Sequence, residues 1–145
     1  MAGEPSGRRI AVTGASGLIG SALVSALRER GDEVLSLVRR PPATASERRW
    51  EPRPGGLDPR ILEDVDAVVH LAGAGVGDKR WTPAYKRLVL SSRVDGTTAV
   101  AQAIAATGKP IRLVNGSAIG YYGDRGDELL DEQSAPGTGF LAEVV

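Results

Sequence analysis

The chain lacks cysteine altogether, has one histidine, and is poor in aromatic residues, which make up 4% of its 145 residues. Without cysteine it forms neither disulfides nor cysteine-ligated metal sites, and thiol catalysis is excluded. His70 alone cannot build a metal site, and no group of carboxylates has ligand spacing, so we expect no metal. No apolar run is long enough to span a bilayer, and residues 1–8 have no apolar signal core.

An excess of charge of either sign is also missing, because 18 Lys and Arg residues balance 18 Asp and Glu residues. A balanced charge favours neither nucleic acid nor an anionic membrane as a partner. The absence of cysteine is compatible with a cytoplasmic protein, which we expect, and the sequence leaves the oligomeric state open. The length predicts one domain over residues 9–145, after a disordered polar lead-in over residues 1–8.

Three glycines spaced three apart, Gly14, Gly17 and Gly20, follow an apolar strand expected at 10–13 and open an amphipathic segment. Such a turn aims free backbone N–H groups and the positive end of a helix dipole at a phosphate. Because strand and helix flank the glycines, we interpret the turn as a pyrophosphate site rather than a plain surface turn. The expected cofactor contacts are Thr13, Gly14, Ala15, Ser16, Gly17, Leu18, Ile19 and Gly20.

Strand and helix patterns alternate along the rest of the chain, which predicts an α/β fold, a doubly wound parallel sheet of the Rossmann type. Further strands are expected at 34–38, 48–51, 66–72 and 111–114, and helices from near Gly17 to Gly31 and from Thr82 to Thr107. The expected core face of the first helix is Leu18, Ile19, Ala22, Leu23, Ala26 and Leu27, and that of the second is Leu90, Val94, Thr97, Ala101 and Ile104. Gly96 costs about 1 kcal/mol inside a helix, so we expect a close packing contact there.

Two arginines, Arg39 and Arg40, occupy the end of the second strand, where an NAD-binding unit usually carries an acidic residue. A guanidinium can form two hydrogen bonds to a ribose 2′-phosphate, which a carboxylate would repel. The sequence therefore predicts NADP(H) over NAD(H), with Arg39 as the first contact and Arg40 as an auxiliary. The alternative is a solvated basic pair at a strand end.

Several motifs resemble the extended short-chain dehydrogenase/reductase superfamily: the glycine turn over 12–20, the run 66–73 and the segment 93–97. Runs at 79–82, 91–94, 117–123 and 139–142 narrow the resemblance to an atypical subgroup of NAD-dependent epimerase/dehydratase-like proteins, the SulA-like, YfcH-like or SDR39U1-like proteins. The resemblance implies a bound dinucleotide and assigns Leu71, Ala72, Gly73 and Arg93 to its site. It also implies that residues 9–145 are the N-terminal part of a longer protein, so the fold is expected to be incomplete at its C-terminus.

Ser117 matches the serine that this superfamily places after the fifth strand, where a hydroxyl can polarise a carbonyl. The tyrosine and lysine of the Tyr-x-x-x-Lys pair fall at Phe140 and Val144, which cannot transfer a proton. Three interpretations remain open: Tyr121 or Tyr122 supplies the acid from a different position, the positive charge comes from another residue (Lys79, Lys86 or Arg93), or the site binds cofactor without turnover. The leading hypothesis is an NADP(H)-dependent oxidoreductase or epimerase acting on a small carbonyl or hydroxyl substrate, and the alternative is a dinucleotide-binding regulatory or interaction module. His70 is expected to be a buried, hydrogen-bonded structural residue.

Overall fold

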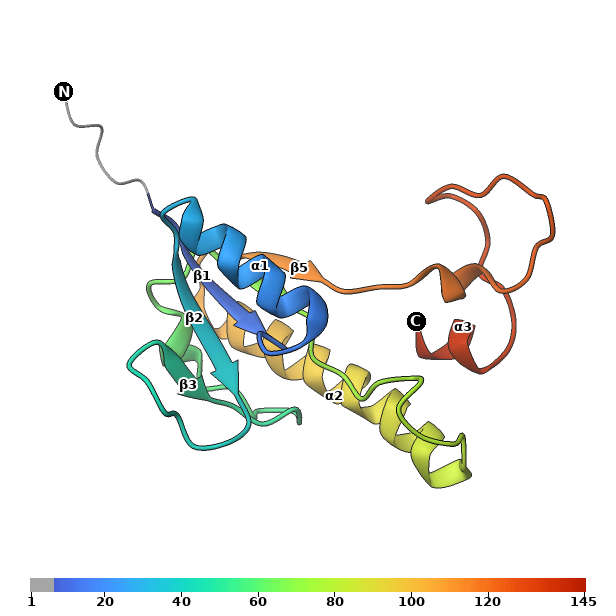
Figure 1. Ribbon diagram of the computed structural model, residues 1–145, viewed down its shortest axis with the longest axis horizontal. Helices are drawn as coiled ribbons and strands as arrows, with labels where there is room; N and C mark the ends of the chain where they lie inside the picture. Colours follow the sequence, from blue (N-terminus) through green and yellow to red (C-terminus); the bar gives the residue numbers. More distant parts are fainter. Residues whose placement is uncertain (1–6) are drawn as a thin grey trace. The chain divides into compact units, whose positions relative to one another are not determined.

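The computed structural model describes residues 7–145, which divide into two compact units on either side of the Asn115–Gly116 bond (Figure 1). Of the expected lead-in, residues 1–6 lie outside the described residues, whereas the backbone N–H of Arg8 donates to the Asp32 carboxylate at 3.0 Å. The first unit contains β1 (Arg9–Thr13), α1 (Leu18–Glu29), β2 (Glu33–Val38), β3 (Glu47–Arg49), the short 3-10 helix η1 (Pro59–Leu62), β4 (Ala67–His70), α2 (Pro83–Thr107) and β5 (Arg112–Asn115). The second contains the 3-10 helix η2 (Ile119–Tyr122) and α3 (Phe140–Val144).

The first unit is built on a sheet of five parallel strands in the order β3-β2-β1-β4-β5. The chain leaves the central strand β1 toward β2 on one side and later returns to β4 on its other side. This order confirms the predicted α/β doubly wound fold. Because all five strands are parallel, their carboxyl ends meet at one edge of the sheet, which is where ligands of such sheets bind.

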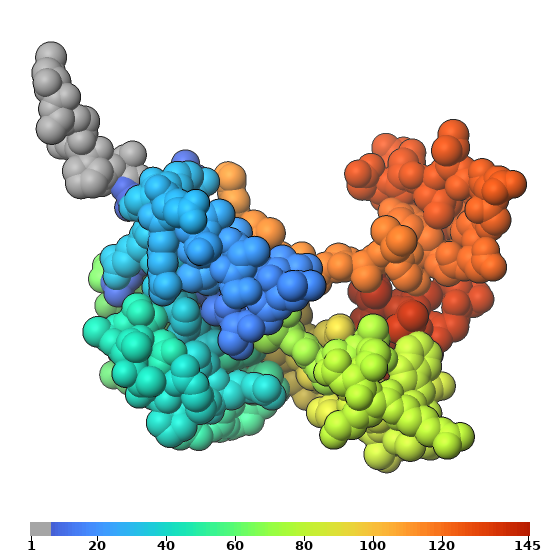
Figure 2. Space-filling model, in the orientation of Figure 1, coloured from blue at the N-terminus to red at the C-terminus, as the bar shows by residue number. Residues whose placement is uncertain are grey.

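Helices cover both faces of this sheet (Figure 1). On one face Val24 and Leu27 of α1 pack against Ile10 and Val12 of β1 and Val34 of β2. Figure 2 shows α1 on the surface of the first unit, on the side that faces the viewer. The other face is covered by α2 and by the segment around η1, through a larger cluster that includes Ala11, Leu35, Trp50, Leu62, Val68 and Val100. Successive residues of a strand point to opposite faces, so β1 supplies Ala11 to one core and its neighbours to the other.

The expected core face of α1 is wrong for most of its residues, because Leu18 and Ile19 are 92% and 69% exposed and Ala22 and Ala26 are exposed as well. The first turn of α1 follows the glycine turn, and the buried stripe begins only at Gly20 and continues through Val24 and Leu27. Burial of the latter two side chains stabilises the fold by about 1.5 to 3 kcal/mol each. The sequence analysis missed Val24.

The two ends of α2 lie where the sequence predicts. The hydroxyl of Thr82 accepts from the backbone N–H of Tyr85 at 3.2 Å, Pro83 is the first helical residue, and Gly108 ends the helix with a left-handed φ of 65°. No helix among residues 7–145 is both long enough and apolar enough to cross a membrane.

The buried face of α2 differs from the expected one. It consists of Tyr85, Val89, Gly96, Ala99, Val100 and Ala103, whereas the expected Val94 is 51% exposed and Ala101 is also exposed. The small residues Gly96, Ala99 and Ala103 lie on the sheet side, where they let the helix approach the strands closely. The expected face, which includes Leu90, Val94 and Ile104, therefore lies beside the buried face on the helix surface.

The strands keep the predicted order with small shifts in their bounds. β3 begins at Glu47, before the expected start, and its edge position suits the prolines that follow it. Trp50 anchors this end of the strand at 2% exposure, as predicted. β5 forms the other edge of the sheet in the described residues, and its Val114 is 51% exposed rather than buried.

Candidate functional site

The glycine turn connects the carboxyl end of β1 to α1, and its three glycines have three different surroundings. Gly14 has a φ of 69°, and a Cβ there would lie 3.0 Å from the backbone N of Ala72. A Cβ at Gly20 would overlap the carbonyl oxygen of Gly14 and lie 2.8 Å from its carbonyl carbon. A Cβ at Gly17 would meet only that same oxygen, at 3.4 Å. The fold thus requires Gly14 and Gly20, and leaves the backbone at Gly17 open to a ligand.

The first turn of α1 offers hydrogen-bond donors without a capping side chain. Gly17 is the N-cap residue, and no side chain caps the helix start. The first N–H groups of a helix have no intrahelical acceptor, and the helix dipole adds partial positive charge there. The N–H groups of Leu18, Ile19 and Gly20 therefore suit an anion, next to the exposed Ser16 of the turn.

A buried hydroxyl joins the glycine turn to the end of β4. Thr13 Oγ1 accepts from the backbone N–H groups of Leu71 and Ala72, both at 3.1 Å, and contacts His70 Nδ1 at 2.7 Å. Because the oxygen already accepts twice, its own proton is donated to Nδ1, which places the ring proton of neutral His70 on Nε2. This network fixes the backbone of Gly14 and of Ala72 relative to each other.

His70 is buried, as predicted, with its ring edge-on to Trp50 at a centroid distance of 5.8 Å. Its Nε2 has no hydrogen-bond partner among the described residues, so the expected hydrogen bonding holds only at Nδ1. Burial lowers the pKa of His70, which keeps the ring neutral. A Cβ at Gly96 would lie 3.4 Å from His70 Cε1 and Nε2, and this close approach of α2 explains the helix-interior glycine.

The loop after β4 is held by side chains of α2. Arg93 Nη1 donates to the carbonyl oxygen of Ala74 at 2.8 Å, and the N–H of Ala74 donates to Ser92 Oγ at 3.0 Å. Tyr85 donates its hydroxyl proton to the carbonyl oxygen of Gly75 at 2.6 Å. Arg93, a predicted cofactor contact, is thus engaged with the loop that follows Gly73. The sequence did not predict the anchoring roles of Tyr85 and Ser92, although Ser92 belongs to the motif over 91–94.

The two arginines after β2 have different surroundings. Arg39 is exposed and makes no hydrogen bond or ion pair with any of residues 7–145. Arg40 instead forms a two-pronged ion pair with Glu47, with Nη1 to Oε2 at 2.9 Å and Nη2 to Oε1 at 2.6 Å. Of the predicted first contact Arg39 and the predicted auxiliary Arg40, only Arg40 is engaged by another side chain of the described residues, at the start of β3.

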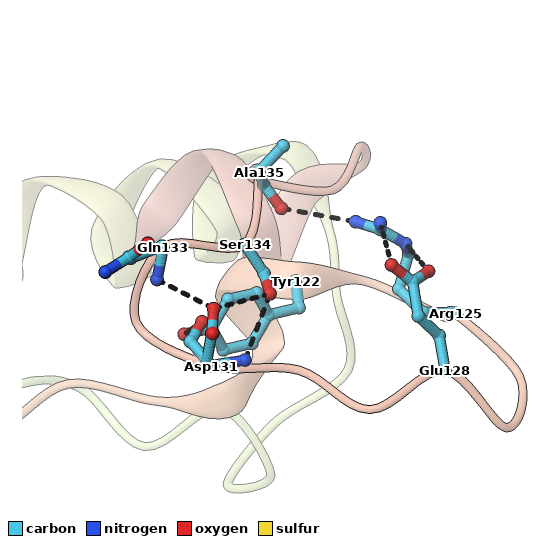
Figure 3. A network of polar contacts seen from close by, with 7 residues as sticks. All are labelled: Tyr122, Arg125, Glu128, Asp131, Gln133, Ser134 and Ala135. Carbon is cyan, nitrogen blue, oxygen red and sulfur yellow. Dashed lines mark hydrogen bonds and ion pairs between the residues drawn. The ribbon is translucent and has the colours of Figure 1, made fainter.

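The second unit contains the candidate catalytic residues. Ser117 is exposed and makes no hydrogen bond with the rest of the described chain. The rings of Tyr121 and Tyr122 pack edge to face, with centroids 5.1 Å apart. Tyr122 donates its hydroxyl proton to the carbonyl oxygen of Asp131 at 2.8 Å, in the polar network that closes the loop over 123–138 (Figure 3). The hydroxyl of Tyr121 has no such partner among residues 7–145.

The same network orders the acidic stretch over residues 124–132. Arg125 binds both carboxylate oxygens of Glu128 and donates to the carbonyl oxygen of Ala135 (Figure 3). The Asp131 carboxylate accepts from the backbone of Gln133 and from the hydroxyl of Ser134, and these bonds lower its pKa. At the positions expected for the proton-transferring pair, Phe140 begins α3 and Val144 is the buried residue of this helix.

The five parallel strands and the glycine turn after the first strand define a Rossmann-type α/β protein. A model of the NAD dependent epimerase/dehydratase family matches residues 10–140, and the chain belongs to this family. The predicted resemblance to NAD-dependent epimerase/dehydratase-like proteins is thereby confirmed at the level of this family.

Known proteins similar to the chain include an epimerase family protein of Mycobacterium bovis, Mb2239. It is 46% identical over 135 residues, which are 93% of this chain and 44% of the relative, so the chain spans less than half of that protein's length. Among solved structures, a nucleoside-diphosphate sugar epimerase from Corynebacterium glutamicum has a TM-score of 0.81 and 38% identity, over 97% of this chain and 29% of that one. The human epimerase family protein SDR39U1 (isoform 2), solved with NADPH, has a TM-score of 0.79 and 28% identity, over 94% of this chain and 45% of that one.

Proposed function

We propose that the chain binds NADP(H) at the glycine turn and forms the cofactor-binding part of a short-chain-type oxidoreductase or epimerase. The observation that carries this proposal is the arrangement of the turn. Gly14 and Gly20 are required by close backbone contacts, whereas a Cβ at Gly17 would meet only the Gly14 carbonyl oxygen, at 3.4 Å, beside a helix start that no side chain caps. A surface turn with a purely structural task would need no open glycine at that position.

The residues present fit a dinucleotide. The N–H groups of Leu18, Ile19 and Gly20 would hold the pyrophosphate, and the loop backbone from Leu71 to Gly73 would border the cofactor at the carboxyl end of β4. Arg39, free and exposed after β2, would bind a ribose 2′-phosphate. The NADPH in the human neighbour supports this choice, with NAD(H) as the alternative cofactor.

The proposed substrate is a small molecule with a carbonyl or hydroxyl group, and the cofactor would supply or accept hydride. Ser117 would donate a hydrogen bond to the reacting oxygen, and Tyr121 would exchange a proton with it. Of the two tyrosines, Tyr121 is favoured because the hydroxyl of Tyr122 is engaged by Asp131. The sugar epimerase among the structural neighbours supports a hydroxyl-bearing substrate for this protein.

A second candidate function is a dinucleotide-binding regulatory or interaction module. It is favoured by Phe140 and Val144, which stand where the superfamily places its tyrosine and lysine and which cannot transfer protons. In this case cofactor occupancy would alter contacts with a partner instead of driving a reaction.

Cofactor choice is tested by titrating the full chain and its Arg39→Asp variant with NADPH and with NADH. Charge-assisted hydrogen bonds are worth about 1.5 to 3 kcal/mol, so the variant should bind NADPH about 10 to 150 times more weakly while NADH binding changes little. An unchanged preference would refute the role of Arg39.

Turnover is tested by following NADPH oxidation with a panel of aldehydes and ketones. Tight NADPH binding without turnover, and without any effect of Ser117→Ala, would support the regulatory module.

A further inference from the structure

Arg40 lies just beyond the carboxyl end of β2, where the proposed function places the cofactor's adenosine ribose, and its ion-pair partner Glu47 lies on the neighbouring strand, opposite Ser36. Arg40 follows the last residue of β2 by two positions, and Glu47 is the first residue of the neighbouring edge strand β3. The six residues 41–46 connect them, and the loop is closed because Glu47 Oε2 also accepts from the backbone N–H of Ala43 at 2.6 Å.

Hydrogen bonds to Glu47 and to the backbone occupy most of the N–H donors of the Arg40 guanidinium. Both terminal nitrogens of Arg40 bind the carboxylate, and Nη1 also donates to the carbonyl oxygen of Pro41 at 3.0 Å. Such two-pronged pairs are among the stronger hydrogen-bonded ion pairs. The Glu47 side chain is 14% exposed, compared with 55% for Arg40, so the carboxylate is the shielded and fixed partner.

The charge of this carboxylate persists over the whole physiological pH range. Hydrogen bonds from Arg40, followed by the backbone of Ala43, lower the pKa of Glu47 to about 2. A permanent negative charge next to the basic pair therefore opposes an incoming phosphate dianion. It also competes with that phosphate for the guanidinium of Arg40.

We propose that Glu47 is a specificity-determining residue that holds Arg40 away from the ribose 2′-phosphate, so that Arg39 alone recognises it. This inference rests on the proposed dinucleotide site and adds a residue that weakens the preference for NADP(H). The chain would then discriminate between the two cofactors with one guanidinium, although its sequence offers two.

The test compares binding of adenosine 2′,5′-bisphosphate with binding of 5′-AMP, because the ratio of the two affinities isolates the 2′-phosphate. The full chain is titrated as wild type and as Glu47→Gln, Arg40→Gln and Arg39→Gln. Glutamine at position 47 keeps an oxygen for the Ala43 N–H, so the loop remains closed while the charge is lost. Glu33→Gln is the matched control, because Glu33 is an exposed, arginine-paired glutamate at the opposite, amino end of β2.

The ratio should rise about twofold to fivefold in Glu47→Gln, which is the factor that exposed ion pairs are worth, and should not change in Glu33→Gln. Arg40→Gln should lower it less than twofold, and Arg39→Gln at least about tenfold. In the Arg40→Gln background, Glu47→Gln should no longer give the full increase. The proposal is overturned if Glu47→Gln leaves the ratio unchanged, or if Arg40→Gln costs as much as Arg39→Gln. Failure of the wild-type chain to bind either nucleotide would instead overturn the proposed function.

Discussion

Replacement of Thr13 by valine tests the buried network that joins the glycine turn to β4. Valine has nearly the shape of threonine but no hydroxyl, so it removes three contacts at 2.7 to 3.1 Å without leaving a cavity. The N–H of Leu71 keeps the carbonyl oxygen of Thr13 as an acceptor at 3.3 Å. The N–H of Ala72 and Nδ1 of His70 lose their partners.

Each unsatisfied buried group costs about 1 to 3 kcal/mol. Ala72 is only partly buried, so its N–H belongs at the low end of this range, whereas His70 is 3% exposed. The added methyl group returns about 0.8 kcal/mol. We therefore expect Thr13→Val to lower the free energy of unfolding by about 1 to 3 kcal/mol. Thr13→Ser, which keeps the hydroxyl and loses one methyl group, should cost about 1 kcal/mol or less and preserve the network.

Two measurements check this prediction. Urea unfolding followed by tryptophan fluorescence gives the stability difference, since the buried Trp50 packs against His70. The ¹⁵N chemical shifts of the imidazole give the tautomer without ambiguity, because the chain has one histidine. Wild type and Thr13→Ser should carry the proton on Nε2. The reasoning is refuted if wild-type His70 carries it on Nδ1, or if Thr13→Val unfolds at the wild-type urea concentration.

Three further predictions concern single positions. Gly20→Ala should lower the free energy of unfolding by about 2 kcal/mol or more, because the new Cβ would overlap the backbone of Gly14. Gly17→Ala should change this free energy by less than about 1 kcal/mol. Thermal unfolding of both variants measures the difference. Because the pKa of His70 is lowered in the folded chain, the unfolded chain binds a proton more readily than the folded one. The free energy of unfolding should therefore be constant above pH 6.5 and fall as the pH drops below it. Urea unfolding at a series of pH values measures this, and the same pH dependence in His70→Asn would exclude His70 as the cause. Tyr122→Phe should loosen the loop over 123–138, which limited proteolysis would detect, without abolishing turnover. Tyr121→Phe should leave the loop intact and abolish turnover, measured as NADPH oxidation.

The fold was predictable because its determinants are local. Thr82, Pro83 and Gly108 delimit α2 through capping chemistry, which acts within one helical turn. The helix faces were less predictable, since the buried side of α2 is set by how closely Gly96 can approach His70 on another element. That contact depends on tertiary packing and has no signature in local periodicity.

In the candidate site, too, local features were predictable and tertiary contacts were not. The glycine spacing identified the turn, and the structure separates Gly17 from the two glycines that the backbone itself requires. The engagement of Arg40 by Glu47 could not be inferred, because the partner follows a loop and belongs to the next strand. Likewise, adjacent tyrosines look equivalent in the sequence until Tyr122 is found bound to Asp131.

Direct titration of the full chain with NADPH tests the central claim, that the open glycine turn binds a dinucleotide. Calorimetry with wild type should show saturable binding at one site, tighter for NADPH than for NADH. Gly17→Val, whose side chain would fill the open space before the helix N–H groups, should keep the fold by circular dichroism and lose the binding. A folded wild-type chain that binds neither dinucleotide, or a folded Gly17→Val variant with wild-type affinity, would contradict the account.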